Sequence, residues 1–265
     1  MQRLFVNPKY EPVFAQQGWS TFGRVVEHFF PNYTRRTKVT VQRVAIPTGH
    51  GDIDAFFKLY QHHASRWRFW MRASKARREF DNYGIFERLG LPAANRMACG
   101  EERNAIGLLQ RAFIVTRTVP NAIELGHFLE NKPPGSERRK VLRELANIVC
   151  RLHGMHFYYH DLVARNILVS RAQTGMPSNE ADTDPCVFLI DCPRGGFARF
   201  GRDRKRLRDL ASLDKTASQQ CSRAERLRFL LRYAGKGRVD AEARALIQAC
   251  IGYRRSRWPE DWRGK

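Results

Sequence analysis

An alternation of β-branched and polar residues is the first regular pattern along the chain, and it begins at Lys38. It runs to Val44, and a turn-forming sequence at residues 48–52 then leads into a second apolar stretch over residues 53–60. Two such stretches joined by a glycine-containing turn indicate a β-hairpin.

A helix is predicted after this hairpin, over residues 75–89. Ser74 can cap its first turn, and Gly90 follows its last residue. By contrast, residues 1–35 hold many aromatic side chains without a clear period, so we expect an irregular segment there.

The second half of the chain begins with a β segment at residues 112–116 and a short linker at 117–122. An amphipathic helix then opens at residues 133–136. Its apolar side chains recur at helical spacing and form one stripe, made of Val141, Leu142, Leu145, Ile148, Val149 and Leu152. A helix with such a stripe is expected in a hydrophobic core.

Two short apolar strands follow this helix, at residues 167–169 and 187–190, with a polar loop at 171–185 between them. Beyond these strands the chain is basic, and we predict that it is mostly helical over residues 199–231 and 240–253.

The linker divides these elements into two parts, which predicts an α+β, bilobal architecture. The N-lobe, residues 1–117, is small and β-rich and includes the irregular N-terminal segment. The C-lobe, residues 118–265, is larger and mainly helical. Because 43% of the 265 residues are hydrophobic, the chain can build a real core and is not a disordered polymer.

The charge of the chain indicates an anionic partner. Lys and Arg number 47 against 26 Asp and Glu, a formal net charge of +21. Nucleic acid, an anionic membrane surface and a phosphorylated substrate all fit this surplus. No apolar run approaches the roughly 20 residues of a spanning helix, the N-terminus lacks the apolar core of a signal peptide, and the cysteines form no C-x-x-C pair. We therefore expect a cytoplasmic protein.

Polar residues that suit phosphoryl transfer flank the two short strands. Asp161 and Asn166 lie directly before the first strand, and Asp191 follows the second. This order is that of a kinase catalytic loop and its metal-binding carboxylate. One carboxylate would orient the attacking hydroxyl and accept its proton, while an amide oxygen and a second carboxylate would hold Mg²⁺ on the phosphates of ATP. Each residue alone is more simply a turn former or cap, but the three in order favour a nucleotide site.

Two residues of the N-lobe extend this pattern. Lys58 lies on the second hairpin strand and would bind nucleotide phosphates, with Glu79 of the following helix paired to it. Glu87, about two turns later, is the alternative partner. Glu79 is preferred because Tyr83, one turn beyond it, faces the same way. In isolation Lys58 would be an ordinary exposed lysine and Glu79 one more charge on a solvated helix face.

At these residues the chain resembles the lipopolysaccharide kinase (Kdo/WaaP) family, which has the protein-kinase-like fold. The resemblance covers roughly residues 38–235. It is carried by residues 152–169, by the helix that starts Lys75-Ala76-Arg77-Arg78-Glu79-Phe80, and by the segments Leu189-Ile190-Asp191-Cys192-Pro193-Arg194 and Arg208-Asp209-Leu210-Ala211.

The resemblance implies transfer of the ATP γ-phosphate to a sugar hydroxyl of the lipopolysaccharide inner core. It implies that Asp161 is the catalytic base and that Asn166 and Asp191 are metal ligands. It further implies that Lys58 contacts the nucleotide phosphates and that Asp209 supports the catalytic loop.

The sequence departs from protein kinases at three points. Tyr159-His160-Asp161 stands where His-Arg-Asp is usual, and Asp191-Cys192-Pro193 replaces Asp-Phe-Gly. Without the usual Arg, we do not expect control by phosphorylation of an activation loop. No G-x-G-x-x-G precedes Lys58, and residues 18–23 are a weak match to a degenerate phosphate-covering loop.

Two basic runs and three histidines have competing interpretations. Residues 66–72 are either a solvated segment with two buried tryptophans or an interfacial patch, because Trp and Arg suit a lipid headgroup layer. The run at 199–208 suits a phosphorylated sugar or an anionic lipid, and no nucleic-acid-binding signature accompanies it. For His153, His156 and His160 we expect structural or substrate-contacting roles rather than zinc ligation. The reason is that Gly154 should end the helix before these three side chains can share one face.

The predicted function is therefore an ATP- and Mg²⁺-dependent kinase for the lipopolysaccharide core or another anionic glycan, and nucleic acid is not the expected partner. It would work in the cytoplasm, with peripheral contact at the inner face of the cytoplasmic membrane. Two alternatives stay open: a kinase-fold enzyme for a protein or small-metabolite hydroxyl, and an inactive pseudokinase or basic binding protein.

Overall fold

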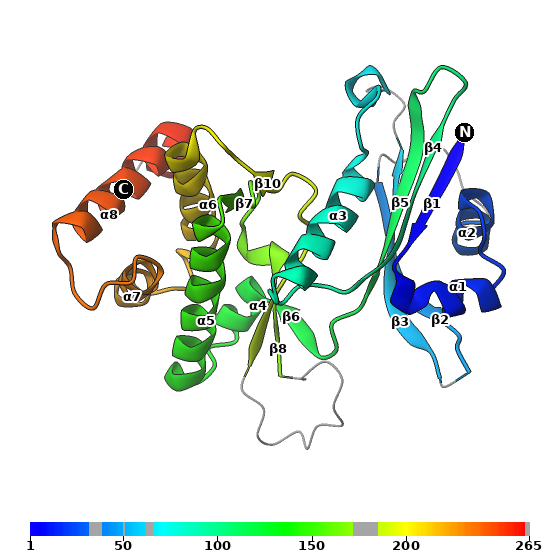
Figure 1. Cartoon of the computed structure of the whole chain (residues 1–265). Coiled ribbons are helices and arrows are strands. Elements are labelled where there is room, and N and C mark those ends of the chain that lie inside the picture. The colour runs from blue at the N-terminus through cyan, green and yellow to red at the C-terminus, as the bar shows by residue number, and fades with distance from the viewer. Residues whose placement is uncertain (32–38, 50, 62–65, 172–184, 263–265) are drawn as a thin grey trace. The chain divides into compact units, whose positions relative to one another are not determined.

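The computed structural model describes residues 1–31, 39–49, 51–61, 66–171 and 185–262. It divides into two compact units, Met1–Thr118 and Val119–Lys265, which we call the N-terminal and C-terminal units. The lobe boundary expected from the sequence lies after residue 117. Figure 1 shows that the first unit is built around a sheet and that helices dominate the second, so the predicted α+β class is confirmed.

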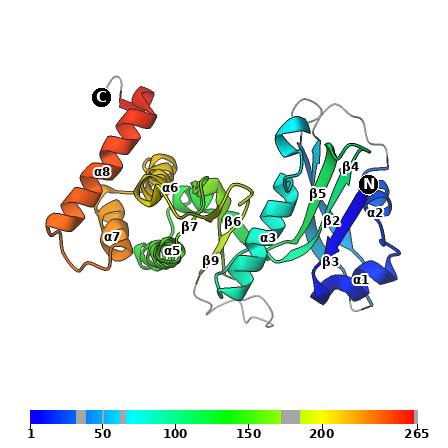
Figure 2. The same cartoon turned by 45° about the horizontal axis from the view of Figure 1, so that its top comes forward.

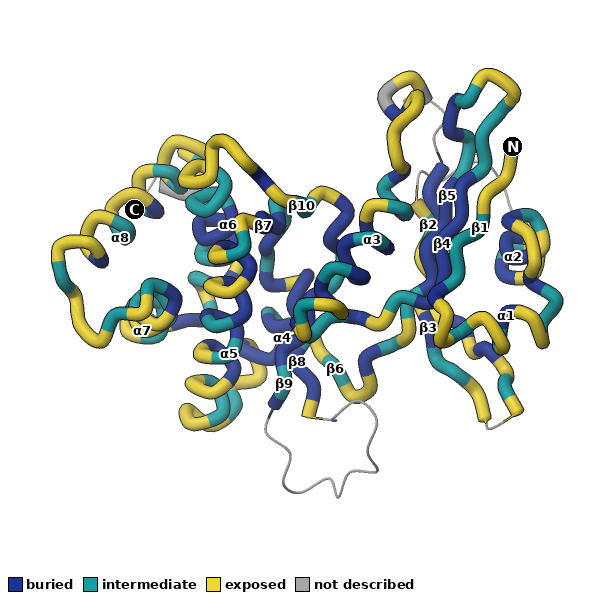
Figure 3. Tube along the Cα trace, viewed as in Figure 1, coloured by how far each residue is buried: buried dark blue, intermediate teal, exposed yellow. Residues whose placement is uncertain are grey.

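A five-stranded antiparallel sheet forms the centre of the N-terminal unit. Its strand order is β1 (Gln2–Val6), β4 (Arg96–Arg103), β5 (Leu109–Arg117), β3 (Ile53–Gln61) and β2 (Val39–Ile46). The pairing of β2 with β3 confirms the predicted hairpin. Burial is concentrated in β3, β4 and β5, as Figure 3 shows, because these strands are covered on both faces.

Helices cover the two faces of this sheet. Figures 1 and 2 both show α3 (Lys75–Arg88) on one face and α1 (Glu11–Gln16) with α2 (Phe22–Phe29) on the other. The cap predicted for α3 is present, since the Ser74 hydroxyl accepts a hydrogen bond from the backbone N–H of Arg77 at 3.0 Å.

The expectation of an irregular N-terminal segment was wrong. Its first residues form β1, which pairs with β4, a strand that lies about a hundred residues later in the chain. Its aromatic side chains pack on the sheet, because Phe22 contacts Phe113 and Phe29 contacts Phe57 at ring-centroid distances of 5.2 and 4.7 Å. The segment up to Phe30 is therefore part of the N-terminal core, and residues 32–35 lie outside the described residues.

The C-terminal unit combines two small antiparallel sheets with helices. One sheet has the order β6 (Ala122–Glu124), β8 (Ile167–Ser170) and β9 (Cys186–Leu189), and the other pairs β7 (Phe157–Tyr158) with β10 (Gly196–Phe197). The helices are α4 (Leu125–Glu130), α5 (Gly135–Gly154), α6 (Arg202–Ala217), α7 (Arg223–Tyr233) and α8 (Ala241–Arg257). Short 3₁₀ turns lie at Pro8–Tyr10, Arg66–Phe69, Ala164–Asn166 and Pro259–Trp262.

The predicted core helix is confirmed as α5, and its apolar stripe is buried. The basic helical stretch expected over residues 199–231 is instead two helices. The chain turns between α6 and α7, where Ser222 and Glu225 form a capping box that starts α7. Most of the polar loop expected at 171–185 lies outside the described residues. In the part of the chain that the structure describes, no helix is long and apolar enough to cross a membrane.

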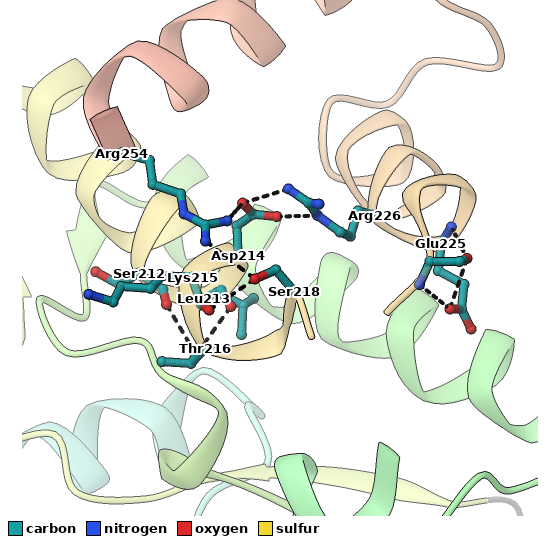
Figure 4. A network of polar contacts seen from close by, with 10 residues as sticks. Ser212, Leu213, Asp214, Lys215, Thr216, Ser218, Glu225, Arg226 and Arg254 are labelled. Atoms are coloured by element: carbon teal, nitrogen blue, oxygen red, sulfur yellow. Dashed lines mark hydrogen bonds and ion pairs between the residues drawn. The ribbon is translucent and has the colours of Figure 1, made fainter. Parts of the chain in front are cut away.

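An ion-pair network fastens α7 and α8 to α6. The carboxylate of Asp214 accepts hydrogen bonds from Arg226 at 2.6 Å and from Arg254 at 2.7 Å (Figure 4). These three side chains line a mainly apolar cavity of about 660 Å³ among α5 to α8. Helix α8 thus packs on α6, whereas α7 packs mainly on α5, to which the Arg138–Glu225 ion pair also ties it, and is linked to α6 through Asp214.

Candidate functional site

The segment between β7 and β8 holds the first two candidate residues, Asp161 and Asn166. A side-chain hydrogen bond closes this loop, because the amide nitrogen of Asn166 donates to the backbone carbonyl of Asp161 at 2.9 Å. Asn166 is buried, whereas the Asp161 side chain is 41% exposed. The loop therefore presents the Asp161 carboxylate to solvent, while the hydrogen bond from Asn166 holds the loop backbone in place.

Asp191 lies at the same end of the small sheet as Asn166. The pairing of β8 with β9 is extended by a hydrogen bond of 3.0 Å from the N–H of Ile190 to the carbonyl of Asn166, and Asp191 is the next residue. Its φ of 58° is in the left-handed region, which costs a residue other than glycine on the order of 1 kcal/mol and recurs at functional sites.

The donor set at this sheet end fits a hard divalent cation. The amide nitrogen of Asn166 donates to Asp161, so its amide oxygen is the atom suited to a metal, and Asp191 carries a carboxylate at the same end of the sheet. Amide and carboxylate oxygens are the ligands that Mg²⁺ prefers. The metal-binding role of Asn166 and Asp191 stays a prediction.

Asp209 on α6 fixes the backbone of the loop that carries Asp161. It is fully buried, and its carboxylate accepts hydrogen bonds from the N–H groups of Tyr159 at 2.7 Å and His160 at 2.8 Å. The ring of His153 lies 3.3 Å from the same carboxylate and 2.8 Å from the hydroxyl of Tyr233. The supporting role expected for Asp209 is thus confirmed, and His153 is a structural residue.

Two further contacts that the sequence did not reveal tie this loop down. The buried Tyr159 hydroxyl donates to the carbonyl of Ile190, which links the loop to the residue before Asp191. From the other side, the hydroxyl of Thr216 on α6 accepts a hydrogen bond from the N–H of Ala164 at 3.0 Å. Figure 4 shows Thr216 on the helix that also carries Asp214, so one helix contacts both the loop and the ion pairs of Arg226 and Arg254.

His160 stands where protein kinases usually have Arg. Its φ of 69° is again left-handed, and its ring lies 3.4 Å from the guanidinium of Arg208. Burial, more than any nearby charge, lowers the pKa of His160 below the ordinary value. A neutral ring can accept the hydrogen bond that Arg208 offers. The expected end of α5 at Gly154 is confirmed, so His156 and His160 lie beyond the helix that carries His153.

Arg194 is a cation in contact with the candidate catalytic base, and the sequence analysis did not assign it a role in the site. A guanidinium nitrogen of Arg194 lies 3.4 Å from the Asp161 carboxylate. The contact joins residues from two separate segments, so spacing along the chain gave no signal of it.

The N-terminal unit brings the other two candidates together. Lys58 on β3 lies 3.5 Å from the carboxylate of Glu79 on α3, and both side chains are largely buried. Glu79 also accepts hydrogen bonds from the hydroxyls of Tyr60 at 3.0 Å and Tyr83 at 3.2 Å. Tyr83, cited from the sequence only because it faces the same way as Glu79, is therefore also a hydrogen-bond donor to this group.

Glu87, the alternative partner of Lys58, is placed elsewhere. It contacts Lys9 at 2.9 Å and Arg96 at 3.5 Å instead. Lys9 and Arg96 hold the pKa of Glu87 below its ordinary value, Lys9 having the larger effect. The structure thus groups Lys58 with Glu79 in one unit, and Asp161, Asn166 and Asp191 in the other.

The weak candidate for a phosphate-covering loop, residues 18–23, has another structure. Trp19 is buried, and the hydroxyl of Thr21 caps α2. A turn with the glycines Gly49 and Gly51 instead connects β2 to the strand of Lys58. Glycine allows close backbone approach to a ligand, so this turn is the better candidate. The sequence pattern that marks this turn, two glycines just before the strand with Lys58, served in the sequence analysis only to predict a hairpin.

The interpretation of residues 66–72 as a segment with two buried tryptophans was wrong. Trp67 and Trp70 are 71% and 52% exposed, and Met71 is exposed beside them. Phe69 is the buried aromatic residue of this run. The interfacial interpretation is the one that stays open.

The fold as a whole resembles that of a solved structure, WaaP in complex with acyl carrier protein. The TM-score is 0.65 at 20% sequence identity, over 98% of this chain and 97% of that chain. Such a fold, with a buried carboxylate holding an Asp–Asn loop and a second Asp after the next strand, defines a protein of the kinase-like class. The chain belongs to the lipopolysaccharide kinase (Kdo/WaaP) family, whose model matches residues 16–233. The family predicted from the sequence is thus confirmed.

Curated relatives are similar over a shorter region. A 3-deoxy-D-manno-octulosonic acid kinase of Haemophilus influenzae strain PittEE is 28% identical over 124 residues, which are 46% of this chain and 49% of the relative. The protein of the same name from strain 86-028NP is 27% identical over the same length. The chain thus spans about half the length of the curated relatives that it matches.

Proposed function

We propose that this protein is an ATP-dependent kinase that phosphorylates a sugar hydroxyl of the lipopolysaccharide inner core. The observation that carries the proposal is the position of the loop that holds Asp161. Buried Asp209 anchors this loop, and the loop lies next to the end of β9, just before Asp191. Family membership supports the lipopolysaccharide substrate class. The sugar acid named in the relatives supports an acceptor that is itself anionic.

In the proposed reaction, the acceptor hydroxyl oxygen forms a bond to the γ-phosphorus, and the bond from that phosphorus to the bridging oxygen of ADP breaks. The proton of the hydroxyl goes to the Asp161 carboxylate, whose exposure leaves it accessible to an acceptor. Lys58, held by Glu79, neutralises phosphate oxygens. Mg²⁺, for which Asn166 and Asp191 are the proposed ligands, supplies further charge neutralisation when bound.

The test is transfer of label from γ-labelled ATP with Mg²⁺ to dephosphorylated lipopolysaccharide core, to a generic protein, and without acceptor. Asp161→Asn keeps the size of the side chain but removes the base, so we expect a loss of roughly 10²–10⁴-fold in kcat. Asp203→Asn, an exposed substitution on α6, is the matched control and should transfer normally.

Label on the core that disappears in Asp161→Asn would support the proposal. Label only on protein would move the assignment to a kinase with a different acceptor. An Asp161→Asn variant that transfers at the rate of the unaltered protein would contradict the role of this residue.

We further propose that the protein works in the cytoplasm, in contact with the anionic inner face of the cytoplasmic membrane. The supporting feature is the exposed group of Trp67, Trp70 and Met71. The Arg103 guanidinium holds this segment in place by donating to the carbonyls of Phe69 at 3.0 Å and Arg72 at 2.7 Å. Exposed Trp on a strongly basic protein suits the headgroup layer of an anionic bilayer.

Cosedimentation with phosphatidylglycerol and phosphatidylcholine vesicles tests this contact. We expect the unaltered protein to bind the anionic vesicles and the double variant Trp67→Ser with Trp70→Ser to lose this binding. Val239→Ser removes an exposed apolar side chain from the other unit and should leave binding intact. Equal binding by the double variant would refute the contact.

A further inference from the structure

The contact between Arg194 and Asp161 puts a cation beside the proposed base. The guanidinium lies 3.4 Å from the carboxylate, and the two side chains are 54% and 41% exposed. An ion pair exposed to this extent is weak, because solvent screens both charges. Arg194 can therefore exchange this contact for another anion at little cost.

The backbone that carries Arg194 is fixed on both sides. Cys192, two residues before it, is fully buried. A Cβ on the next residue, Gly195, would lie 2.3 Å from the sulfur of Cys192 and 3.0 Å from the ring of Phe157, so the chain packs tightly there and only glycine fits. Gly196 then pairs with Tyr158 of β7. The guanidinium is thus presented from an anchored position.

Two more cations lie close to the same loop. Arg208 contacts the His160 ring at 3.4 Å, and Lys205, one turn earlier on α6, donates to the carbonyl of Phe200 at 3.1 Å. His160 is the residue directly before Asp161. Arg194 and Arg208 thus put two guanidinium groups near the base, while the carboxylate of Asp209 on α6 is buried and engaged by the loop backbone.

An anionic acceptor needs such a cation. Its hydroxyl must approach the Asp161 carboxylate to within hydrogen-bond distance, which also brings the acceptor's own negative charge close to Asp161. A guanidinium between the two lowers this repulsion, and its planar fork can bind a carboxylate or phosphate through two parallel hydrogen bonds.

We propose that Arg194 is an acceptor-binding residue that recognises a carboxylate or phosphate close to the reacting hydroxyl of the acceptor sugar. The inference rests on the proposed function and adds to it the group that selects anionic sugars. In the absence of acceptor, Arg194 is held by Asp161. On binding, the guanidinium turns to the acceptor anion and leaves the carboxylate of Asp161 for the hydroxyl.

The experiment compares a sugar acid, 3-deoxy-D-manno-octulosonic acid, with its uncharged methyl ester. Binding is measured by calorimetry without nucleotide, and transfer by labelled ATP. Arg194→Gln should weaken binding of the acid roughly 10–100-fold, the range for a lost hydrogen bond to a charged group, and leave binding of the ester within about threefold. Arg194→Lys should recover part of the loss.

Arg238→Gln is the matched control, since it removes the same charge from an exposed position elsewhere in the C-terminal unit, outside the basic run 199–208. It should lower acid binding by less than about threefold, as expected for a screened surface charge. A purely structural role of Arg194 would weaken acid and ester equally and would not be rescued by Lys.

The ratio of acid to ester affinity, measured in the unaltered protein and in Arg194→Gln, tests the inference separately from the transfer reaction. If Arg194→Gln discriminates between acid and ester as the unaltered protein does, or if the unaltered protein binds neither, the inference is wrong. If the unaltered protein prefers the acid, and Arg194→Gln loses this preference while no label reaches any core sugar, then the proposed function fails and the anion site stands.

Discussion

Replacement of Asp209 by Asn would test whether this residue holds the catalytic loop. The carboxylate accepts from two backbone N–H groups, those of Tyr159 and His160, and lies beside the ring of His153. An Asn side chain keeps one oxygen acceptor but turns an NH₂ group toward one of these donors. That donor is then buried without a partner, and the remaining bond loses its charge.

The expected cost follows from these contacts. An unsatisfied buried donor costs about 1–3 kcal/mol, and loss of the charged acceptor weakens the second bond by about 1 kcal/mol more. We therefore expect Asp209→Asn to lower the free energy of unfolding by about 2–4 kcal/mol. Against a usual total of about 5–15 kcal/mol this is a large share, and kcat should fall with it.

Urea unfolding followed by tryptophan fluorescence measures this change, with phosphoryl transfer assayed in parallel. Asp203→Asn is the control, because Asp203 is exposed in the first turn of the same helix and contributes less than about 1 kcal/mol through the helix dipole. An Asp209→Asn variant within about 0.5 kcal/mol of the unaltered protein would refute the reasoning, since that is the cost of an ordinary surface change.

Three further substitutions test other parts of the site. Glu79→Gln should lower kcat/KM for ATP roughly 10–100-fold, because Lys58 loses a charged partner, whereas Glu87→Gln should leave kinetics unchanged. Gly195→Ala should lower the melting temperature and cost about 1–3 kcal/mol through overpacking, while Gly196→Ala, whose Cβ meets nothing within 4 Å, should not. Burial lowers the pKa of His160, so the folded state binds a proton at this ring less readily than the unfolded state. The free energy of unfolding should therefore fall as pH drops below about 6.5. His160→Gln should show a smaller fall in this free energy between pH 7.5 and 5.5. An equal drop in both proteins would contradict this last expectation.

Elements defined by their own residues were predictable from the sequence. The hairpin of β2 and β3, the capped helix α3 and the amphipathic helix α5 each carry a local period or cap. β4 was missed because it ends in Glu101, Glu102 and Arg103, a composition unlike that of a strand. The structure accommodates these charges in ion pairs, such as Arg103 with Glu101 at 3.1 Å.

The residues of the candidate site were predictable only where their order along the chain has meaning. Asp161 and Asn166 could be proposed because a kinase loop fixes their sequence spacing, and Asp191 because it follows the next strand. Arg194 and Thr216 could not, because each contacts the loop through space from a different segment. Contacts of this kind depend on tertiary packing, and one sequence does not display it.

The position of Asp209 also has a consequence for the order in which the protein matures. The chain is synthesised from its N-terminus, and Asp209 lies 50 residues after Tyr159, whose N–H it binds. Residues 159–166 therefore leave the ribosome before the helix that fixes their backbone exists. Closing such a long loop costs entropy before the contact compensates it. The loop that carries Asp161 should be among the last parts to order, so the proposed site is incomplete in a nascent chain until α6 has folded.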